Sequence, residues 1–560
     1  MIVGLDMGGT HIDAVIIKNS KIINTVKKPN NPDNPFHALW QTLETLLSGY
    51  DKSEIKRINL STTVSTNAIV ENRVSTVGMI IQRGPGLYNN FLACGDDNLF
   101  ISGSIDHRGE IVKNFNPKEL EEGIESFRKN NIQNCAIVTK FSTRNPQQEI
   151  LIKNMVDKKF SFTTMGHTLS GKLNFPRRVF TSYLNAAVYD SFNNFSKNIR
   201  KSFEKEGINP PIFILKADGG TLSLSAAGEK PVETILSGPS ASFMGMSALF
   251  DTEEDALLLD IGGTTTDIFF LADGVALFEP LGIKIGPYKT LVRSIYSVSI
   301  GLGGDSRIVI ENKKIKIGPI REGSPYAFGG PKPTPTDAMI SLGLMKDGDM
   351  NKANEAMGLL AKDLGLSIRD VSRLVLATMG DMIKEKVDEL LYDINSKPVY
   401  TVKELLHGKE VKPKVIQVIG GPAKVLSPIL SEKFHLPCNY PQNHHVANAV
   451  GAALAKPTTE INMLADTSKG ILSVPELGIY EKISRNYTLD NARDRAIKLL
   501  KDNAEAIGAN KEDIGTERTE ESSFNMVRGF STSGQNIRIK AQIKPGLLYK
   551  LKGGIENDES

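Results

Sequence analysis

The stretch VGLDMGGTHID, residues 3–13, returns almost unchanged as LLLDIGGTTTD at residues 257–267. Six residues are identical at matched positions, and Asp6 and Asp13 of the first copy correspond to Asp260 and Asp267 of the second. Apolar, strand-like residues flank both copies. Because such agreement in one register is hard to reach by chance, the repeat predicts a duplicated domain.

Each copy joins a carboxylate at the end of a strand to a glycine turn. The two glycines can adopt positive φ and direct several N–H groups toward one point, as in nests that bind phosphate. A carboxylate repels phosphate, so we expect it to hold Mg²⁺ or its water. The predicted metal-associated carboxylates are Asp6 and Asp260. The predicted phosphate-binding residues are Gly8, Gly9, Thr10, Gly262, Gly263, Thr264 and Thr265.

One such turn alone is equally consistent with an ordinary hairpin. Two copies that face each other across a cleft would hold the β- and γ-phosphates of one nucleotide from both sides. Asp13 and Asp267 follow on the next strand of each copy. Each is predicted to be either a general base or a structural carboxylate that pins the turn.

Two further glycine turns support a nucleotide site. Gly420 and Gly421 lie between a strand and a helix in VIGGPAKVL, where backbone can lie flat against an adenine or a ribose. Gly303 and Gly304 in GLGGDS are predicted to contact the γ-phosphate or the substrate. A plain turn is the alternative for both.

Length, charge and cysteine content exclude several classes of protein. The chain has 560 residues, which predicts three or four domains. A net charge of +3 gives no electrostatic reason to expect nucleic acid or an anionic membrane as partner. The three cysteines form no CxxC pair, so we expect no zinc or iron–sulfur site. We also expect no signal peptide and no membrane span, hence a cytoplasmic protein.

Alternating strand-like and helix-like segments predict α/β layers through most of the chain. We predict an N-terminal half at 1–185, a second half at 186–456, and a small α+β appendage at 457–560. Residues 180–207 predict one long helix closed by Gly207. In the appendage, Thr488 is the predicted N-cap of a helix that ends before Gly508.

Several segments together resemble the A type of the hydantoinase/oxoprolinase family, within the superfamily of actin, sugar kinases and heat-shock chaperone ATPases. They occur in family order between about residues 2 and 455: GLDMGGTHIDAVI, STTVSTNAIVENR, KFSTRNPQQE, ETILSGPSAS, LLLDIGGTTTDI, SIGLGGDS and GGPKPTPTDAMISLG. The resemblance implies two duplicated actin-like (ribonuclease H-like) ATPase halves around a nucleotide cleft, followed by the small appendage.

The resemblance implies ATP-dependent opening of a cyclic amide or imide, such as a hydantoin, 5-oxoproline or a lactam, through phosphorylation of the amide oxygen. ATP and Mg²⁺ are the implied cofactors. The implied assembly is a homo- or hetero-oligomer that can include a B-type partner. The alternatives are a component of an ATP-dependent carboxylase, a non-catalytic ATPase switch such as a chaperone or reactivating factor, and a small-molecule kinase.

The resemblance also points to further residues. Asp337 of the TPTDA segment is either a helix cap or a catalytic or metal-binding carboxylate. Thr66, Asn67 and Arg73 line the substrate side or stabilise a helix N-terminus. The chain departs from the family pattern at Leu60–Ser61 (usually His-Gly), Phe175 (usually glutamate) and Asp305 (usually glycine).

Overall fold

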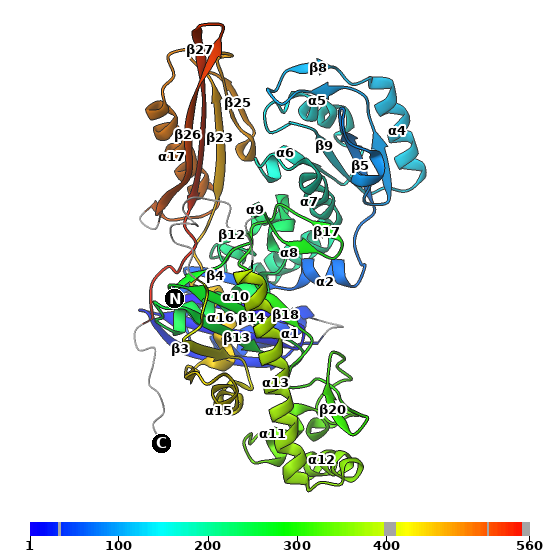
Figure 1. Cartoon of the computed structure of the whole chain (residues 1–560), viewed down its shortest axis with the longest axis vertical. Helices are drawn as coiled ribbons and strands as arrows, with labels where there is room; N and C mark the ends of the chain where they lie inside the picture. Colours follow the sequence, from blue (N-terminus) through cyan, green and yellow to red (C-terminus); the bar gives the residue numbers. More distant parts are fainter. Residues whose placement is uncertain (32–34, 280, 397–409, 512–513, 552–560) are drawn as a thin grey trace.

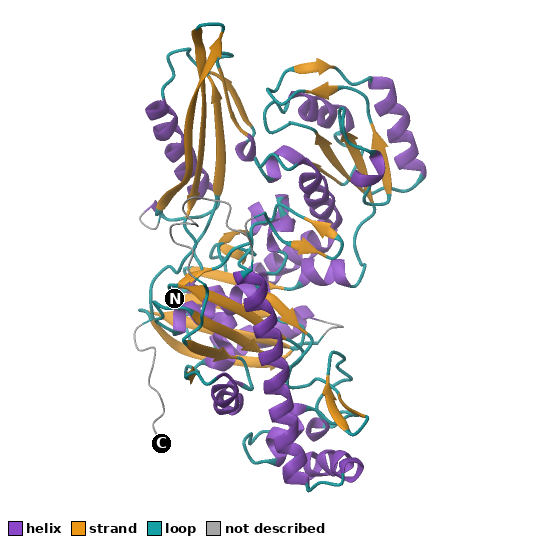
Figure 2. Ribbon diagram, in the orientation of Figure 1, coloured by secondary structure: helices purple, strands orange, loops and turns teal. Residues whose placement is uncertain are grey.

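The computed structural model describes residues 1–31, 35–279, 281–396, 410–511 and 514–551. Within them the chain forms a mixed α/β fold with several separate sheets (Figures 1 and 2). Two large sheets lie at the centre, and the other parts extend from them toward the two ends of the molecule. Among the described helices, none combines the length and apolarity that crossing a bilayer requires.

The first central sheet carries the first glycine turn between its strands β1 and β2. Its strand order is β12-β11-β4-β1-β2-β3. β1, β2 and β3 form an antiparallel meander, and β4 runs parallel to β1. The strands are β1 Ile2–Met7, β2 His11–Lys18, β3 Lys21–Pro29, β4 Arg57–Thr62, β11 Ile212–Leu215 and β12 Thr221–Ser223. Helices α1 Pro35–Leu47, α8 Tyr189–Lys205 and α9 Leu224–Glu229 supply apolar side chains to one face of it.

The second central sheet repeats this hairpin around the second glycine turn. Asp260 on β13 pairs with Asp267 on β14, just as Asp6 pairs with Asp13. The strand order is β15-β14-β13-β21-β22, with β18 paired to β14. The strands are β13 Ala256–Ile261, β14 Thr266–Ala272, β15 Val275–Ala276, β18 Val298–Ile300, β21 Val415–Ile419 and β22 Cys438–Asn439. Helices α13 Ile368–Asn395 and α15 Ala423–Phe434 contribute to the apolar core on one of its faces.

Two helices, α10 Ser237–Leu249 and α16 Ala447–Leu454, join the two central sheets into one core with side chains from both. The backbones of these helices lie very close to each other and to β1. A Cβ added at Gly451 would lie 2.1 Å from the carbonyl oxygen of Ala241, and one at Gly4 would lie 2.2 Å from that of Ala449. Glycine is therefore required where α16 meets α10 and β1.

A lobe lies above the first central sheet in Figure 1 and is built on a four-stranded parallel sheet ordered β10-β9-β5-β6. Its strands are β5 Val77–Gln82, β6 Asp97–Phe100, β9 Asn134–Thr139 and β10 Phe162–Met165, beside a small hairpin of β7 Ser104–Ile105 and β8 Ile111–Lys113. Its helices are α3 Asn89–Leu92, α4 Pro117–Lys129, α5 Gln147–Val156, α6 Gly166–Leu169 and α7 Phe175–Ala187; α2 Val64–Val70 follows β4 and leads into it.

A second extension, at the lower end in Figure 1, precedes and includes part of α13. It contains α11 Pro335–Ser341, α12 Met350–Leu364 and the hairpin of β19 Ile308–Glu311 with β20 Lys314–Ile317. The short hairpin of β16 Lys284–Ile285 and β17 Tyr288–Lys289 lies near α7 instead. Short 3-10 helices occur at Lys52–Glu54, Pro231–Thr234, Tyr326–Phe328, His444–Val446 and Pro475–Leu477.

The C-terminal residues form a separate antiparallel sheet ordered β25-β24-β23-β27-β26, with α17 packed on its apolar side. The elements are β23 Glu460–Asp466, β24 Ile471–Val474, β25 Ile479–Lys482, α17 Leu489–Ala506, β26 Thr516–Arg528 and β27 Ser531–Ile543. Thr488 caps α17 through a capping box, which confirms the predicted N-cap.

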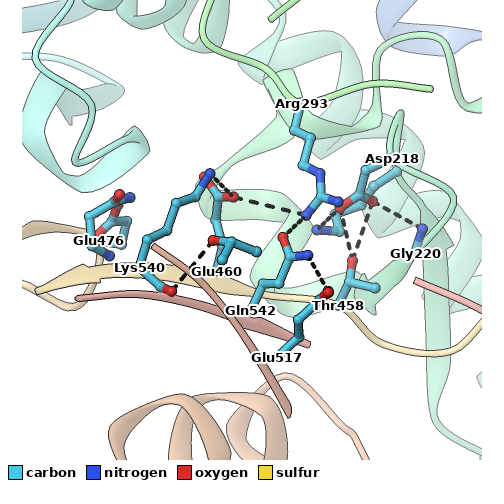
Figure 3. A network of polar contacts seen from close by, with 12 residues as sticks. Asp218, Gly220, Arg293, Thr458, Glu460, Glu476, Glu517, Lys540 and Gln542 are labelled. Atoms are coloured by element: carbon cyan, nitrogen blue, oxygen red, sulfur yellow. Dashed lines mark hydrogen bonds and ion pairs between the residues drawn. The ribbon is translucent and has the colours of Figure 1, made fainter. Parts of the chain in front are cut away.

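A polar network attaches this C-terminal sheet to the rest of the chain (Figure 3). Thr458 donates to the carboxylate of Asp218 at 3.1 Å, and Arg293 hydrogen-bonds to Gln542 and lies 3.9 Å from Glu460. Elsewhere Glu476 accepts the backbone N–H of Gly171 at 2.7 Å. The charged groups at this junction are half or wholly buried. Each of them is hydrogen-bonded or ion-paired, as buried polar groups generally are.

One helix differs from the sequence-based expectation. The long helix predicted over 180–207 is two helices, α7 and α8, which meet at Val188. Strands from both sides of the predicted boundary at residue 185 enter the first central sheet, because β11 pairs with β4. That boundary stays a prediction.

We predict that Gly451→Ala lowers the free energy of unfolding by about 2 kcal/mol or more, because overpacking forces the backbone of α10 away. Gly228→Ala is the matched control: it also lies in a helix but has nothing within 4 Å of its added Cβ. Helix propensity favours alanine over glycine by about 1 kcal/mol, so the control is expected to be neutral or stabilising. Urea unfolding of both variants followed by circular dichroism measures this, and equal effects would contradict it.

Candidate functional site

The structure brings four carboxylates from the two repeated hairpins together. Asp6 and Asp13 face each other across β1 and β2, and Asp260 and Asp267 do so across β13 and β14. Asp6 feels the charges of Asp13 and Asp260, and Asp267 feels those of Asp260 and Asp6. The ends of the two hairpins therefore lie within electrostatic reach of each other.

Burial and mutual repulsion perturb these carboxylates. Burial first, and then the charge of Asp13, raises the pKa of Asp6 to about 7. Burial and the charge of Asp260 raise the pKa of Asp267 to about 7. Burial also raises the pKa of Asp13, although Lys27, whose Nζ lies 2.8 Å from that carboxylate, opposes the rise. Strongly perturbed carboxylates that gather in one place are typical of functional sites.

Asn448, near the start of α16, connects the two hairpins. Its Nδ2 donates to Asp260 Oδ2 at 3.2 Å, and its side chain also approaches Asp6 and opposes the rise of that pKa. Ser242 of α10 donates to the same oxygen of Asp260 at 2.6 Å. Sequence reasoning missed both residues. The only signal for Asn448 is that a lone amide interrupts the small apolar residues of ANAVGAAL.

The glycine turns present backbone donors. Within the described residues, the N–H groups of Gly9, Thr10, Gly263 and Thr264 donate to no protein acceptor. In the first turn Asn30 ties down the carbonyl oxygens of Gly8 and Thr10, each at 2.8 Å, so its side chain and backbone shape the turn. Unpaired N–H groups in consecutive turn residues are what an anion-binding nest requires.

The third and fourth glycine turns pack against the second. Gly304 N–H donates to the carbonyl of Gly262 at 2.9 Å, which joins the 301–306 turn to the 262–265 turn. Gly420 has a φ of 95°, and a Cβ there would lie 2.9 Å from Asp260 Oδ1. Around Gly421 there is open space within 4 Å of an added Cβ. Gly303, Gly304 and Gly420 thus pack against the Asp260 turn, and Gly421 follows Gly420 in the chain.

The contacts of Asp337 are those of a residue that caps a helix. Thr334, three residues earlier, is the N-cap of α11, and Asp337 completes its capping box. The buried carboxylate accepts hydrogen bonds from the N–H groups of Tyr326, Ala327 and Thr334 and from the Thr334 hydroxyl. Of the two alternatives left by the sequence, helix capping accounts for these contacts, although the residue at the N-cap itself is Thr334.

The residues predicted on the substrate side occupy α2 and its end. Thr66 Oγ1 accepts the N–H of Leu236 at 3.0 Å, just before α10, and Asn67 donates to Thr63 at 3.2 Å. Arg73 forms an ion pair with Glu71 and is largely exposed. Thr66 and Asn67 thus lie near the start of α10, whereas the Arg73 side chain points into solvent.

Two of the positions that depart from the family pattern are structural. Leu60 is fully buried in β4. Phe175 begins α7, and the Arg178 guanidinium lies 5.7 Å from its ring. Glu149 of the NPQQE segment is also fully buried and lies 2.5 Å from the ring of His167. Phe175 and Glu149 belong to the lobe, whereas Leu60 packs in the core of the first central sheet.

The carboxylate cluster has capacity for a cation. Asp6 Oδ1 and Asp267 Oδ1 are buried and have no hydrogen-bond partner. Over the described ranges, no group of three or more His, Cys, Asp or Glu side chains has the arrangement of a metal site. Carboxylate oxygens without a partner are ligands of the kind that Mg²⁺ prefers.

Two cavities lie apart from this cluster, beside the C-terminal sheet. One of about 510 Å³ lies between that sheet and the Lys216–Asp218 turn, and one of about 1030 Å³ lies between it and the lobe. None of the predicted site residues lines either cavity. Volume alone therefore does not identify the site.

Comparison with known families gives two matches that together span most of the chain. A family model described as hydantoinase/oxoprolinase matches residues 178–461. A second, described as the hydantoinase/oxoprolinase N-terminal region, matches residues 2–160.

Individual relatives are more distant. An uncharacterized protein of Methanocaldococcus jannaschii is 26% identical over 506 residues, which cover 81% of this chain and 72% of that protein. The alpha subunit of the caprolactamase of Pseudomonas jessenii is 25% identical over 381 residues, which cover 62% of this chain and 55% of that subunit. The match thus spans about half the length of the caprolactamase subunit.

Solved structures share the fold along nearly the whole chain. A nucleotide-free acetone carboxylase aligns with a TM-score of 0.70 at 16% identity, covering 99% of this chain and 88% of that one. The ATP-dependent caprolactamase of Pseudomonas jessenii aligns with a TM-score of 0.69 at 18% identity, covering 96% and 87%.

We predict that Asp6→Asn and Asp267→Asn stabilise the protein at about pH 8 by roughly 1–4 kcal/mol but have little effect near pH 4. Each folded-state pKa of about 7 lies above the usual value, so unfolding releases protons between about pH 4 and pH 7. The free-energy penalty for burying the charged carboxylate is therefore absent below about pH 4 and complete above about pH 7. Thermal unfolding across the window measures the effect.

Asp347→Asn, on the exposed surface, is the control for a simple change in net charge. A stabilisation by Asp6→Asn and Asp267→Asn that does not depend on pH would contradict the assignment of raised pKa values.

Proposed function

Because the chain belongs to the hydantoinase/oxoprolinase family, we propose that it is an ATP-dependent amidohydrolase that opens a cyclic amide or imide of the hydantoin, 5-oxoproline or lactam class. The observation that carries the proposal is the cluster of four carboxylates between two glycine turns with matching register. The caprolactamase relative supports a lactam as one member of the substrate class.

In this proposal the two central sheets are duplicated actin-like halves, and the nucleotide lies between their turns. The free N–H groups of Gly9, Thr10, Gly263 and Thr264 bind the phosphates. Gly8, Gly262, Thr265, Gly303 and Gly304 shape that cradle, and Gly420 and Gly421 face the adenosine.

Asp6 and Asp260 would hold Mg²⁺, and the unpartnered Oδ1 of Asp6 is the observation that fits a cation. When bound, the ion would neutralise the negative charge of the phosphates. Asn448 and Ser242 orient Asp260 by donating to its Oδ2, which leaves the other oxygen of that carboxylate for the ion or its water.

Phosphoryl transfer activates a carbonyl that is otherwise inert. The amide oxygen attacks the terminal phosphorus, the bond from that phosphorus to the bridging oxygen breaks, and ADP leaves with the electron pair. Water then adds to the ring carbon and gives up a proton, and the ring C–N bond breaks as its nitrogen takes up a proton. A second water hydrolyses the resulting acyl phosphate to the open-chain acid and inorganic phosphate.

Asp267 is the better general base of the two candidates. Its raised pKa of about 7 matches a base that works near neutral pH, and one of its oxygens is unpartnered. Asp13 is instead held by Lys27, so we assign it a structural role. Thr66 and Asn67 at α2 border the substrate side, where their hydroxyl and amide groups suit recognition of an amide.

A role in an ATP-dependent carboxylase is the second candidate, since the fold extends over nearly the whole acetone carboxylase chain. Bicarbonate dependence of ATP turnover separates the two reactions. The caprolactamase relative is named as one subunit of its enzyme, so we also propose that this chain works with a second, B-type subunit.

The test is release of ADP and phosphate by the purified protein with hydantoins, 5-oxoproline and lactams, with and without the product of the neighbouring gene. We expect Asp6→Ala and Asp260→Ala each to lower magnesium-dependent turnover by about 10²-fold or more, because each removes charge from the proposed phosphate site. Asp251→Ala, a surface carboxylate paired with Lys550, is the matched control and keeps its activity. Unchanged turnover in Asp6→Ala and Asp260→Ala would refute the site.

A further inference from the structure

Asp305, where the resemblance leads us to expect a glycine, carries an ion pair at the second phosphate turn. Its Oδ2 lies 2.8 Å from where a Cβ of Gly263 would be, so the carboxylate touches that turn. Its N–H donates to the carbonyl of Gly263 at 2.7 Å, which fixes the residue in place. The same Oδ2 lies 3.3 Å from Nη2 of Arg321.

Arg321 reaches this position from the loop after β20. Its side chain is 29% exposed, yet its Nε is buried and has no hydrogen-bond partner. A guanidinium has five N–H donors in a fixed planar fork, and the ion pair with Asp305 uses only one side of it. The protein therefore leaves donors of this group unsatisfied.

The charge of the guanidinium also reaches the first phosphate turn. After burial and Lys27, the charge of Arg321 contributes to lowering the pKa of His11 to about 4, and His11 follows Gly9 and Thr10 directly. The His11 ring contacts the Thr10 hydroxyl at 3.1 Å. Arg321 is thus held against one phosphate turn by Asp305 and lies within electrostatic reach of the other.

A cation is needed at this place. Asp6, Asp13, Asp260 and Asp267 already concentrate negative charge, and a triphosphate would add more. Lys27 is committed to Asp13 and to the carbonyl of His445. Arg321, in contrast, is a cation at the site whose donors remain available.

We propose that Arg321 is a catalytic residue that binds the terminal phosphate of the nucleotide, and that Asp305 is the positioning residue that holds it there. The inference rests on the proposed nucleotide site between the two turns. It gives Asp305 a purpose: the carboxylate that replaces a glycine brings a phosphate-binding arginine with it, and the pairing offsets the repulsion that a free carboxylate would exert on the phosphates.

The experiment compares binding of ADP and of a non-hydrolysable ATP analogue by calorimetry, together with turnover, in the full-length protein. We expect Arg321→Gln to weaken the ATP analogue about tenfold or more while ADP affinity changes by less than about twofold, because only the triphosphate carries the terminal group. Turnover is expected to fall about 10²–10³-fold, as it does when one donor to a developing oxyanion is removed. Arg321→Lys keeps the charge but loses the fork and is expected to be intermediate.

Asp305→Asn tests the positioning role. It is expected to lower kcat about tenfold in the presence of Arg321 and to have no further effect in Arg321→Gln, since the two residues act as one unit. Arg307→Gln is the matched control, because Arg307 lies next to strand β19 and pairs with Glu322 instead. Its nucleotide affinity and turnover are expected to stay at the wild-type level.

The outcomes separate the two proposals. A wild-type protein that binds neither nucleotide refutes the proposed function and the inference together. Wild-type binding with equal losses of ADP and ATP analogue in Arg321→Gln, or with no loss, refutes only the role of Arg321. If Arg321→Gln does not fold, the same comparison in Arg321→Lys decides.

Discussion

The structure depends on forcing two buried aspartates of separate sheets, Asp6 and Asp260, into one small volume. Asn448 stands between them and donates to Asp260, while glycines in α16, α10 and β1 remove the side chains that would hold the backbones apart. Each hairpin could form alone from local contacts. Only the packing of α10 and α16 between the sheets turns two separate loops into one site.

Such a site is costly for the folded protein. Burial first, and then repulsion between like charges, raises the pKa values of Asp6 and Asp267 to about 7. The available compensation is partial: Lys27 pairs with Asp13, and Arg321 pairs with Asp305. The proposed occupants, a cation and a polyphosphate, would offset this cost, since a ligand that binds only the folded state stabilises it.

The family motifs divide between the site and the scaffold. The two glycine turns and the 301–306 turn surround the carboxylates. Glu149 of the NPQQE segment instead forms a buried pair with His167 in the lobe, and Asp337 closes a capping box. A residue that recurs in a family pattern can therefore serve the fold alone, and its hydrogen-bond partners distinguish the two roles. The C-terminal sheet is attached by its own charged network, away from the carboxylates (Figure 3).

The sequence by itself determined the family, the α/β character, the two repeated hairpins with their glycine turns, and the helix capped by Thr488. These follow from local rules, namely strand patterning, glycine-containing turns and capping, which act over a few residues. Only the tertiary structure decided that Asn448 meets Asp260, 188 positions away, that Arg321 pairs with the atypical Asp305, and that β11 joins the first sheet. It also decided the break at Val188 between α7 and α8. The reason is that a side chain's partner across a packed core depends on how whole elements are stacked, and no spacing along the chain encodes that distance.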